Sequence, residues 1–131
     1  MERILNYMTE PLLSITPSAT VTEASYYMHD NEIHSLLVEE TGEYIGIITS
    51  NDISRKVVTE NLDPETVQVS SIMTYPVIKM DHQTSMEEAT QTMRDHNIHH
   101  LVVTANDQTL GILSVTDYSK YLVRKFQVEV S

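Results

Sequence analysis

The strongest constraint on the fold of this chain is an internal repeat with one fixed offset. Residues 46–52 read GIITSND and residues 111–117 read GILSVTD, 65 positions later. The same offset aligns residues 8–58 with residues 73–123 without a gap, and roughly 16 of the 51 aligned pairs are identical, where unrelated sequences would share about 3. A repeat of this length is typical of one supersecondary unit that a chain uses twice.

A turn signal separates the two copies. The segment ENLDPET at residues 60–66 contains Asp63-Pro64, and proline disfavours helix at the residue before it. We therefore place the boundary at this dipeptide and predict one repeat in residues 1–63 and the other in residues 64–131.

Composition excludes several classes of function. The 131 residues carry a formal net charge of -11, from 8 Lys and Arg against 19 Asp and Glu, which argues against binding to nucleic acid or to an anionic membrane. Cysteine is absent, so disulfides, thiolate nucleophiles and thiolate metal sites are excluded. The N-terminal residues lack the apolar core of a signal peptide, and no run reaches the roughly 20 apolar residues that span a bilayer. We expect a soluble, cytoplasmic protein.

Each copy predicts the same helix near its start. Residues 20–23 (TVTE) and 85–88 (SMEE) are S/T-x-x-E capping boxes, in which a hydroxyl and a carboxylate reciprocally bind free N–H groups at a helix N-terminus. Apolar residues then recur at i, i+3 and i+7, the spacing of one buried stripe. The two stripes are Val21, Ala24 and Met28 in the first copy and Met86, Ala89 and Met93 in the second.

Short β-rich runs follow this helix in each copy. They are SLLVEE and YIGIIT in the first copy and HLVVTA and TLGILS in the second. Turn residues separate the two runs of a copy, so each pair predicts a hairpin. Residues 12–15 and 77–80 predict a leading strand for each copy.

A second helix is expected after Asp52 and after Asp117, because apolar residues again recur at helical spacing. The predicted order is therefore β-α-β-β-α, twice, which is an α/β fold. These second helices offer more apolar surface than one buried face requires, and we expect a homodimer through them. The residues concerned are Ile53, Val57 and Val58 in the first copy and Tyr118, Leu122 and Val123 in the second.

The order of the motifs resembles a known family. In both copies Met-Thr-x-Pro is followed by a T/S-x-x-E-A helix start, by Ile-His-x-Leu and by G-h-h-S/T-x-x-D, in which h is aliphatic. This order resembles a tandem pair of CBS domains, called a Bateman module, over nearly the whole chain. The resemblance implies two β-α-β-β-α CBS repeats of mixed α/β class that pack by their sheets with pseudo-two-fold symmetry.

The same resemblance implies a regulatory function rather than catalysis. Pairs of this kind bind an adenosine ligand in the cleft between the repeats, such as AMP, ADP, ATP, NAD or S-adenosylmethionine, and many are homodimers. We therefore expect a module that binds an adenine nucleotide as a regulatory ligand, not as a cofactor, and that signals the bound state to a partner protein. A ligand shifts such a protein only if its affinity differs between two conformations.

Resemblance implies that Asp52 and Asp117 accept hydrogen bonds from ribose hydroxyls. Four neighbouring polar side chains would add neutral donors near a phosphate: Thr49, Asn51, Ser114 and Thr116. Such residues at a strand-to-helix junction are also ordinary N-caps, worth about 1 kcal/mol each. Because capping explains one residue per helix, we interpret the paired hydroxyl and aspartate in both copies as favouring ligand contact.

Cationic side chains are the expected partners of phosphate. Arg55 and Lys120 follow the two aspartates by three residues, and the Ile-His-x-Leu position supplies His34 and His99, with His100 beside the latter. The resemblance implies that Asp52 faces His99 and His100, and that Asp117 faces His34. Each also has an ordinary explanation, as a solvated cation or a packed structural histidine.

Apolar residues of the leading strands are expected to hold the adenine. The candidates are Leu12, Leu13, Val77 and Ile78, which would equally serve a hydrophobic core. Many members of the family have proline after the leucine of Ile-His-x-Leu, whereas this chain has Leu37 and Val102. The width of the pocket is therefore left open.

Two alternatives to nucleotide binding remain open. His96, His99 and His100 with Asp95 have a spacing that suits Zn²⁺ or Ni²⁺, although only His99 has a histidine counterpart in the first copy. The other alternative is a ligand-free module for dimerisation and partner docking, in which the Asp and Thr residues only cap helices. An enzyme is disfavoured, because no G-x-S-x-G or Walker loop occurs.

Overall fold

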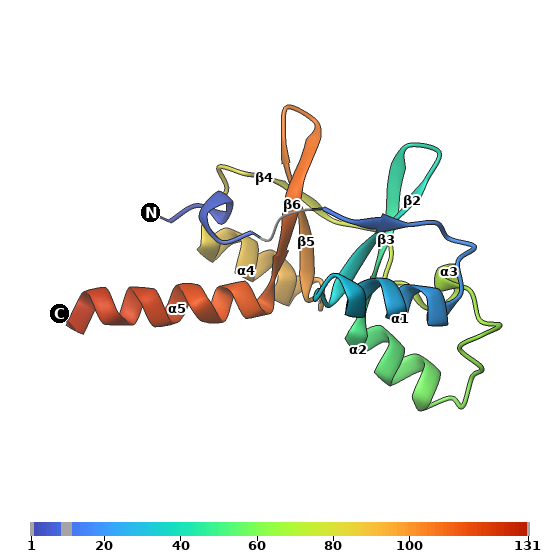
Figure 1. The fold of residues 1–131 in the computed structure, drawn as a ribbon. Coiled ribbons are helices and arrows are strands. Elements are labelled where there is room, and N and C mark those ends of the chain that lie inside the picture. The colour runs from blue at the N-terminus through green and yellow to red at the C-terminus, as the bar shows by residue number, and fades with distance from the viewer. Residues whose placement is uncertain (1, 9–11, 131) are drawn as a thin grey trace. The chain divides into compact units, whose positions relative to one another are not determined.

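The computed structural model describes residues 2–8 and 12–130, without the side chains of 128–130. It divides into two compact units. The first, called the 13–77 unit, consists of residues Leu13–Val77, and the second, called the 78–131 unit, combines Ile78–Ser131 with Met1–Leu12. Each unit contains one three-stranded sheet with its helices (Figure 1).

In the 13–77 unit the sheet has the strand order β1-β2-β3. Strand β1 is parallel to β2, and β2 is antiparallel to β3. The elements are β1 (Ser14–Ile15), α1 (Val21–Asp30), β2 (Ser35–Glu40), β3 (Glu43–Thr49), α2 (Ser50–Asp52), the π-helical turn η2 (Ile53–Val58) and α3 (Val69–Ile72).

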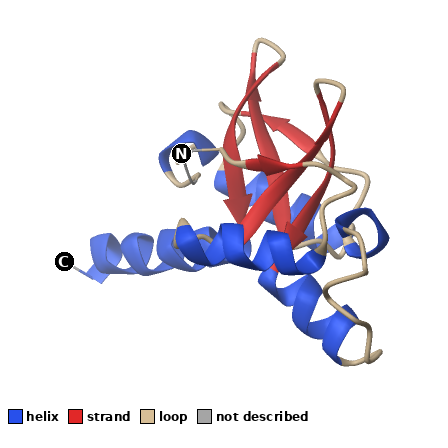
Figure 2. Cartoon of the chain, turned by 45° about the vertical axis from the view of Figure 1, so that its right-hand side comes forward, coloured by secondary structure: helices blue, strands red, loops and turns tan. Residues whose placement is uncertain are grey.

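The 78–131 unit repeats this topology with the order β4-β5-β6. Strand β4 is parallel to β5, and β5 is antiparallel to β6. The elements are the 3-10 helix η1 (Ile4–Asn6), β4 (Lys79–Asp81), α4 (Met86–Asp95), β5 (His100–Ala105), β6 (Gln108–Ser114) and α5 (Val115–Val130). The order β-α-β-β-α in both units confirms the predicted α/β class, and Figure 2 shows the helices and strands of the chain.

The leading strands are shorter than expected. Strand β1 begins at Ser14 and β4 at Lys79, so the predicted starts at residues 12 and 77 are wrong. Pairing extends one residue further back, because the carbonyl groups of Leu13 and Ile78 accept hydrogen bonds from the N–H groups of the neighbouring strands. Leu12 and Val77 lie before the strands, and the Met-Thr-x-Pro motif at residues 8–11 falls largely outside the described residues.

Only one of the two predicted capping boxes is complete. Thr20 accepts from the N–H of Glu23, and the Glu23 carboxylate accepts from the N–H of Thr20. Ser85 accepts from the N–H of Glu88 at 3.2 Å, but the reciprocal bond is absent from the described contacts at this helix. Instead, Ser85 forms an isolated antiparallel β-bridge with Arg3 at the start of this helix.

Both hairpins are confirmed, and their turns have a backbone reason. Thr41 and Gly42 connect β2 to β3 with φ of 48° and 84°. Asn106 and Asp107 connect β5 to β6 with φ of 51° and 66°. Two successive positive φ values are the requirement of a type I′ turn, whose twist matches that of the flanking strands.

The predicted apolar stripes are buried in both units. All six stripe residues of α1 and α4 are at most 4 % exposed, and they pack against the central strands of their own unit. A short helix completes each core. Helix η1 precedes β1 in sequence but packs in the 78–131 unit, and α3 precedes β4 but packs in the 13–77 unit. Ile4 of η1 is fully buried in the 78–131 unit, and Ile72 of α3 is 3 % exposed in the 13–77 unit.

The compact units therefore do not have the same bounds as the sequence repeats. The expected bounds of 1–63 and 64–131 describe units of sequence and stay a prediction. The turn expected at Asp63-Pro64 is present, since the Asp63 carbonyl accepts from the N–H of Thr66 and its side chain accepts from the N–H of Glu65.

The second helices of the two units differ in length. In the 13–77 unit, α2 and η2 end at Val58, followed by Asn61 with φ of 55°, a left-handed residue of the kind that terminates helices. In the 78–131 unit, α5 continues for 16 residues. Among the described side chains of α5, the large apolar ones that are exposed are Val115, Leu122, Val123 and Phe126.

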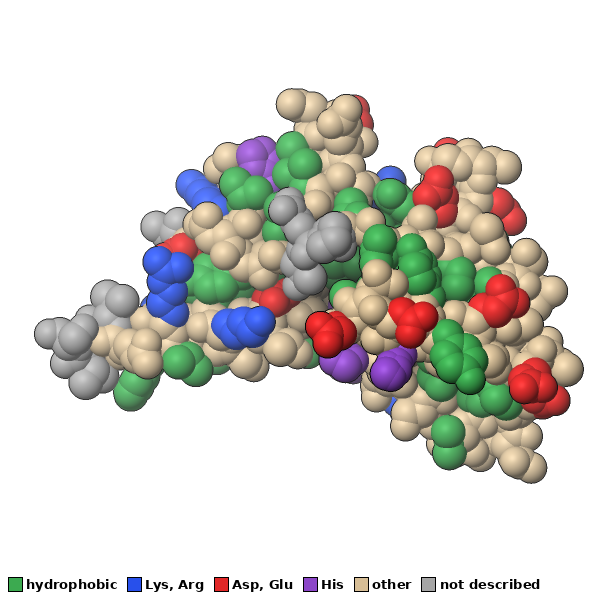
Figure 3. Space-filling view, viewed as in Figure 1, with side chains coloured by type: hydrophobic (Ala, Val, Ile, Leu, Met, Phe, Trp, Pro, Cys, Tyr) green, Lys and Arg blue, Asp and Glu red, His purple; other side chains and the backbone are tan. Residues whose placement is uncertain are grey.

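Charge is distributed unequally between the units. The 13–77 unit has ten Asp and Glu against two Arg and Lys, whereas the 78–131 unit has nine against six. Figure 3 shows acidic side chains over α1 and the β2–β3 hairpin and basic side chains over α5. None of the helices in the described part of the chain combines the length and the apolar composition that a bilayer-spanning helix requires.

Candidate functional site

The predicted hydroxyl and aspartate pairs lie at the junctions from β3 to α2 and from β6 to α5. At the first junction Asp52 is 4 % exposed and Thr49 is 7 % exposed. Asp52 Oδ2 accepts from the backbone N–H and the hydroxyl of Thr49, both at 3.1 Å. The Thr49 hydroxyl in turn accepts from the N–H of Asp52 at 3.0 Å.

The second oxygen of Asp52 is also occupied. The hydroxyl of Thr74 donates to Oδ1 at 3.1 Å, and the ammonium of Lys56 lies 3.3 Å from the same atom. Lys56 also donates to the carbonyl oxygen of Ile72 at 2.7 Å. Asp52 and Lys56 therefore attach the segment 72–74 to the end of β3, where Ile47 and Thr74 form a backbone bridge.

Asp117 has fewer partners than Asp52. It is 4 % exposed, and its Oδ2 accepts from the N–H of Ser114 at 2.8 Å and from the Ser114 hydroxyl at 3.2 Å. No hydrogen bond to its Oδ1 comes from the part of the chain that the structure describes. Burial raises the pKa of Asp117, and the Ser114 hydrogen bonds and the charge of Lys120 oppose that rise.

Helix capping accounts for the three-residue spacing of these pairs. At α2 the reciprocal bonds between Thr49 and Asp52 form a capping box. Ser114 and Asp117 make the same contacts at α5. The argument that the paired spacing itself favours a ligand is therefore wrong, because S/T-x-x-D caps a helix as S/T-x-x-E does. What distinguishes the two sites is the partner of the second carboxylate oxygen.

The expected cationic and neutral donors are exposed. Asn51, Arg55, Thr116 and Lys120 all have solvent-accessible side chains. Of these, Lys120 acts on the motif, since its charge opposes the raised pKa of Asp117. The four side chains are therefore accessible to a ligand or to water.

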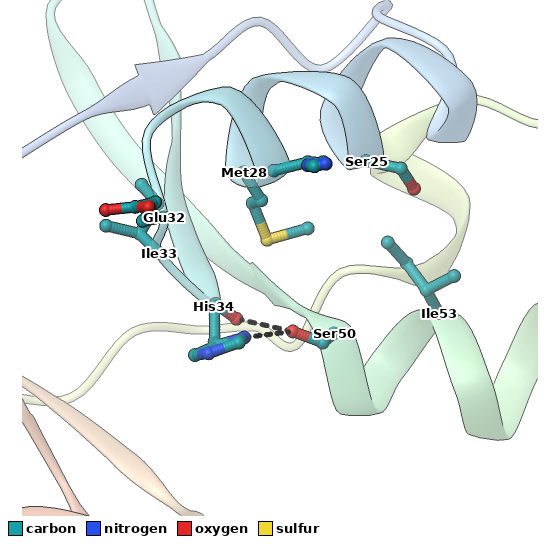
Figure 4. A pocket seen from close by; sticks show the side chains of 8 residues that line it. Ser25, Met28, Glu32, Ile33, His34, Ser50 and Ile53 are labelled. Carbon is teal, nitrogen blue, oxygen red and sulfur yellow. Dashed lines mark hydrogen bonds between the residues drawn. The ribbon is translucent and has the colours of Figure 1, made fainter.

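His34 and His99 line two equivalent grooves beside the helices. The first groove, of about 590 Å³, is lined by Ser25, Met28, His29, Glu32, Ile33, His34, Ser50 and Ile53. Figure 4 shows Met28 and Ile53 pointing into it and Ser50 hydrogen-bonded to the ring and the carbonyl of His34. His99 lies in the second groove, of about 280 Å³, between α4 and α5. Neither lining includes Asp52 or Asp117.

The remaining candidates have mainly structural surroundings. Leu13 packs against the core of the 13–77 unit and Ile78 against that of the 78–131 unit. Leu12 and Val77 are half-buried, as is His100 at the start of β5. The facing of Asp52 toward His99 and His100, and of Asp117 toward His34, stays a prediction. No group of three or more His, Asp or Glu side chains suitable for a metal ion occurs in the described part of the chain.

The sequence interpretation missed Lys56 and Thr74. Lys56 follows Asp52 by four residues, a spacing at which opposite charges pair on a helix surface, so this contact had a sequence signal. Thr74 lies 22 residues away from Asp52 and had none. In the second repeat the position equivalent to Lys56 is Tyr121.

A family model for the CBS domain matches residues 4–59 and 69–124. The chain belongs to the CBS-domain family. A CBS pair is a regulatory module, and CBS-domain proteins are generally not catalytic. An uncharacterised protein of Methanopyrus kandleri is 34 % identical over 120 residues, which are 88 % of this chain and 61 % of that protein.

Solved structures of CBS pairs share the fold of this one. A CBS-domain protein from Burkholderia ambifaria matches with a TM-score of 0.83 and 26 % identity, covering 94 % of this chain and 95 % of that one. The CBS pair of protein MJ0100, in complex with 5′-methylthioadenosine and S-adenosyl-L-methionine, matches with a TM-score of 0.80 and 24 % identity over 95 % and 98 % of the two chains.

Proposed function

We propose that this CBS pair is a regulatory module that binds an adenosine ligand through the ribose at an aspartate motif. The observation that carries the proposal is the state of Asp117. Its carboxylate is buried, one oxygen is fixed by Ser114, and the other accepts no hydrogen bond from the described residues. That oxygen still has access to solvent, because the hydroxyl of Tyr7 is the one buried side-chain polar atom without a partner among the described residues. The two hydroxyls of a ribose are donors that can reach it.

The class of ligand is supported by a protein of the same fold. The MJ0100 CBS pair was solved with 5′-methylthioadenosine and S-adenosyl-L-methionine, both of which contain an adenosine. In the present chain a phosphate on the ligand would meet the N-terminus of the 16-residue helix α5, where free N–H groups favour an anion. Lys120 and Thr116 are exposed on the first turns of that helix.

A ligand panel tests this function. Thermal unfolding is measured with AMP, ADP, ATP, NAD and S-adenosylmethionine, and with 5′-methylthioadenosine as a neutral member. A ligand that binds only the folded protein stabilises it by about 2.7 kcal/mol at 100 times its dissociation constant. If no member of the panel raises the unfolding temperature, ribose binding is rejected.

The variant Asp117→Ala tests the residue. Loss of hydrogen bonds to a charged acceptor weakens binding by roughly 2 to 3 kcal/mol, which is about 30- to 150-fold in the dissociation constant. Titration calorimetry on the folded variant measures this loss. Unchanged affinity would reject Asp117 as the ribose acceptor.

A specific observation also favours self-association. The side chains of Leu122, Val123 and Phe126 on α5 are 44 %, 59 % and 68 % exposed. Adjacent exposed apolar side chains on one helix are characteristic of an interaction surface. We propose that a second copy of the chain covers them, and that ligand state reaches a regulated protein through the assembled module.

A further inference from the structure

We propose that the two aspartate motifs have diverged, so that Asp117 binds ribose and Asp52 is closed to ligand by the ammonium of Lys56. This inference rests on the proposed function, and it specifies which motif performs it and the number of ligands that each chain binds.

The first step is a count of acceptor positions. An ionised carboxylate offers about four lone-pair positions on its two oxygens. At Asp52 these are met by four donors: the N–H and hydroxyl of Thr49 on Oδ2, and Thr74 and Lys56 on Oδ1. A ribose hydroxyl at Asp52 must therefore displace an existing donor.

The second step compares Asp117 with this arrangement. The two contacts on Oδ2 are reproduced by Ser114, but no described residue donates to Oδ1. One of the two donors to Oδ1 is lost by substitution, and the position equivalent to the other donor, Thr74, is Thr9, which lies outside the described residues. Tyr121 replaces Lys56 and is directed elsewhere, since its hydroxyl donates to Glu87 and its ring packs edge-on against Tyr7.

The third step concerns the strength of the contact at Asp52. Lys56 binds two acceptors at once, Asp52 Oδ1 at 3.3 Å and the carbonyl of Ile72 at 2.7 Å. Its side chain is 33 % exposed and that of Asp52 only 6 %, so solvent screens the pair incompletely. Displacing Lys56 would leave the Ile72 carbonyl without this donor as well, and a ribose hydroxyl replaces only one of these contacts.

The net charge of the two units also favours binding of a phosphate-containing ligand at Asp117 over Asp52. The 13–77 unit has an excess of eight acidic groups and the 78–131 unit an excess of three. A ligand that carries phosphate is therefore repelled less by the surroundings of Asp117.

The test is the stoichiometry of AMP binding by titration calorimetry. The unmodified protein should bind one AMP per chain. Asp117→Asn should weaken this binding at least 30-fold, whereas Asp52→Asn should retain one equivalent wherever circular dichroism shows it to be folded. Two equal equivalents per chain in the unmodified protein, or loss of binding in folded Asp52→Asn alone, would overturn the inference.

A gain-of-function variant tests the role of Lys56 directly. Lys56→Met removes the ammonium but keeps an unbranched side chain, and it should bind a second AMP per chain. Lys125→Met is the matched control, because Lys125 pairs with Glu87 in the other unit and its removal changes net charge equally. A single equivalent in folded Lys56→Met, or a second one in Lys125→Met, would show that Lys56 does not close the motif. If no panel ligand binds even the unmodified protein, the proposed function fails instead.

Discussion

The ammonium nitrogen of Lys56 lies 3.3 Å from Asp52 Oδ1, while the same position after Asp117 is Tyr121. This substitution removes one of the two donors to Oδ1, whereas the two aspartates share their positions at strand ends and their capping bonds. Asp52 connects β3 with the segment 72–74, and Asp117 retains an oxygen for which the described residues provide no donor. Their variants should consequently differ in their effects on folding.

Asp52→Asn should destabilise the protein by about 1 to 3 kcal/mol, since it removes the charge that holds Lys56 and weakens the bond from Thr74. The value is at the lower end if solvent already screens Lys56, which is 33 % exposed. Urea unfolding at pH 7 measures the change. Stability equal to that of the unmodified protein would show that the Asp52–Lys56 pair contributes nothing to folding.

Asp117→Asn should instead stabilise the protein at pH 7. Burial raises the pKa of Asp117 above its usual 3.8, so the folded state binds this proton more tightly than the unfolded chain. The contribution of the group is most favourable below pH 3.8 and is lost as pH rises through the raised pKa. An uncharged amide avoids that loss and can still accept from the N–H of Ser114.

Unfolding free energies of Asp117→Asn and the unmodified protein are compared at pH 7 and pH 4. The advantage of the variant should shrink at the lower pH, because the raised pKa lets a larger fraction of Asp117 carboxyl groups be protonated there than at pH 7. A variant that is less stable at pH 7 would mean that the ionised Asp117 is needed as a helix cap.

Much of this fold could be predicted from the sequence, because the signals are local. Capping residues, apolar stripes and turn residues act within a few positions, and they located α1, α4 and both hairpins. The short leading strands were less predictable. Strand β1 has two residues and β4 has three, and their pairing depends on parallel partners more than 20 residues away.

The candidate site was harder to predict from the sequence, because the contacts that distinguish Asp52 from Asp117 join residues far apart in the chain. The bond from Thr74 to Asp52 requires the segment after α3 to lie on β3, and no local pattern specifies that. The meaning of the hydroxyl and aspartate spacing was misjudged because one local mechanism, the capping box, explains it completely. The end of α5 lies beyond residue 123, where the repeat alignment stops, so the repeat gave no information about Phe126.

Gly46→Ala should destabilise the 13–77 unit. A Cβ at this position would lie 2.5 Å from Met73 Sδ and 3.1 Å from the Thr74 carbonyl oxygen. The methionine side chain can move, but the carbonyl belongs to the bridge between Ile47 and Thr74. Overpacking of this kind costs about 1 to 3 kcal/mol.

Gly42→Asn is the control for this substitution. Gly42 has φ of 84° and no atom within 4 Å of an added Cβ, and asparagine tolerates the left-handed region better than other residues. Equal destabilisation by both variants would show that the loss at Gly46 is not due to the close approach of residues 73 and 74.

Tyr121 should ionise at a higher pH than exposed tyrosines do. Its hydrogen bond to Glu87, followed by burial, raises its pKa from 10 to about 12. The stabilisation linked to this proton is complete below pH 10 and is lost as pH rises through about 12. Glu87→Gln should lower the tyrosine pKa, because the acceptor loses its charge.

Ultraviolet titration of phenolate formation checks this prediction. The difference between the unmodified protein and Tyr121→Phe should show little phenolate at pH 11 and about half of the full phenolate signal near pH 12. A difference curve centred at pH 10 would mean that the bond to Glu87 is absent in solution.

Self-association should depend on one face of α5. Val115, Leu122, Val123 and Phe126 fall at i, i+7, i+8 and i+11 along the helix, which places them on one stripe. Each is at least 42 % exposed. Covering these side chains removes apolar surface from water at about 25 cal/mol per Å², whereas a glutamate in the stripe would bring an unpaired charge into the interface.

Sedimentation at micromolar concentration should therefore give about twice the chain mass of 14.9 kDa for the unmodified protein. Phe126→Glu should shift the protein toward the monomer, with little change in its unfolding temperature measured at low concentration. Arg124→Glu is the matched control, since it introduces the same side chain at an exposed position of α5 off the apolar stripe and changes net charge more. If Arg124→Glu dissociates the dimer as fully as Phe126→Glu, general repulsion rather than the apolar stripe governs assembly. A monomeric unmodified protein, with or without AMP, would remove the dimer from the proposed function and leave α5 open to a different partner.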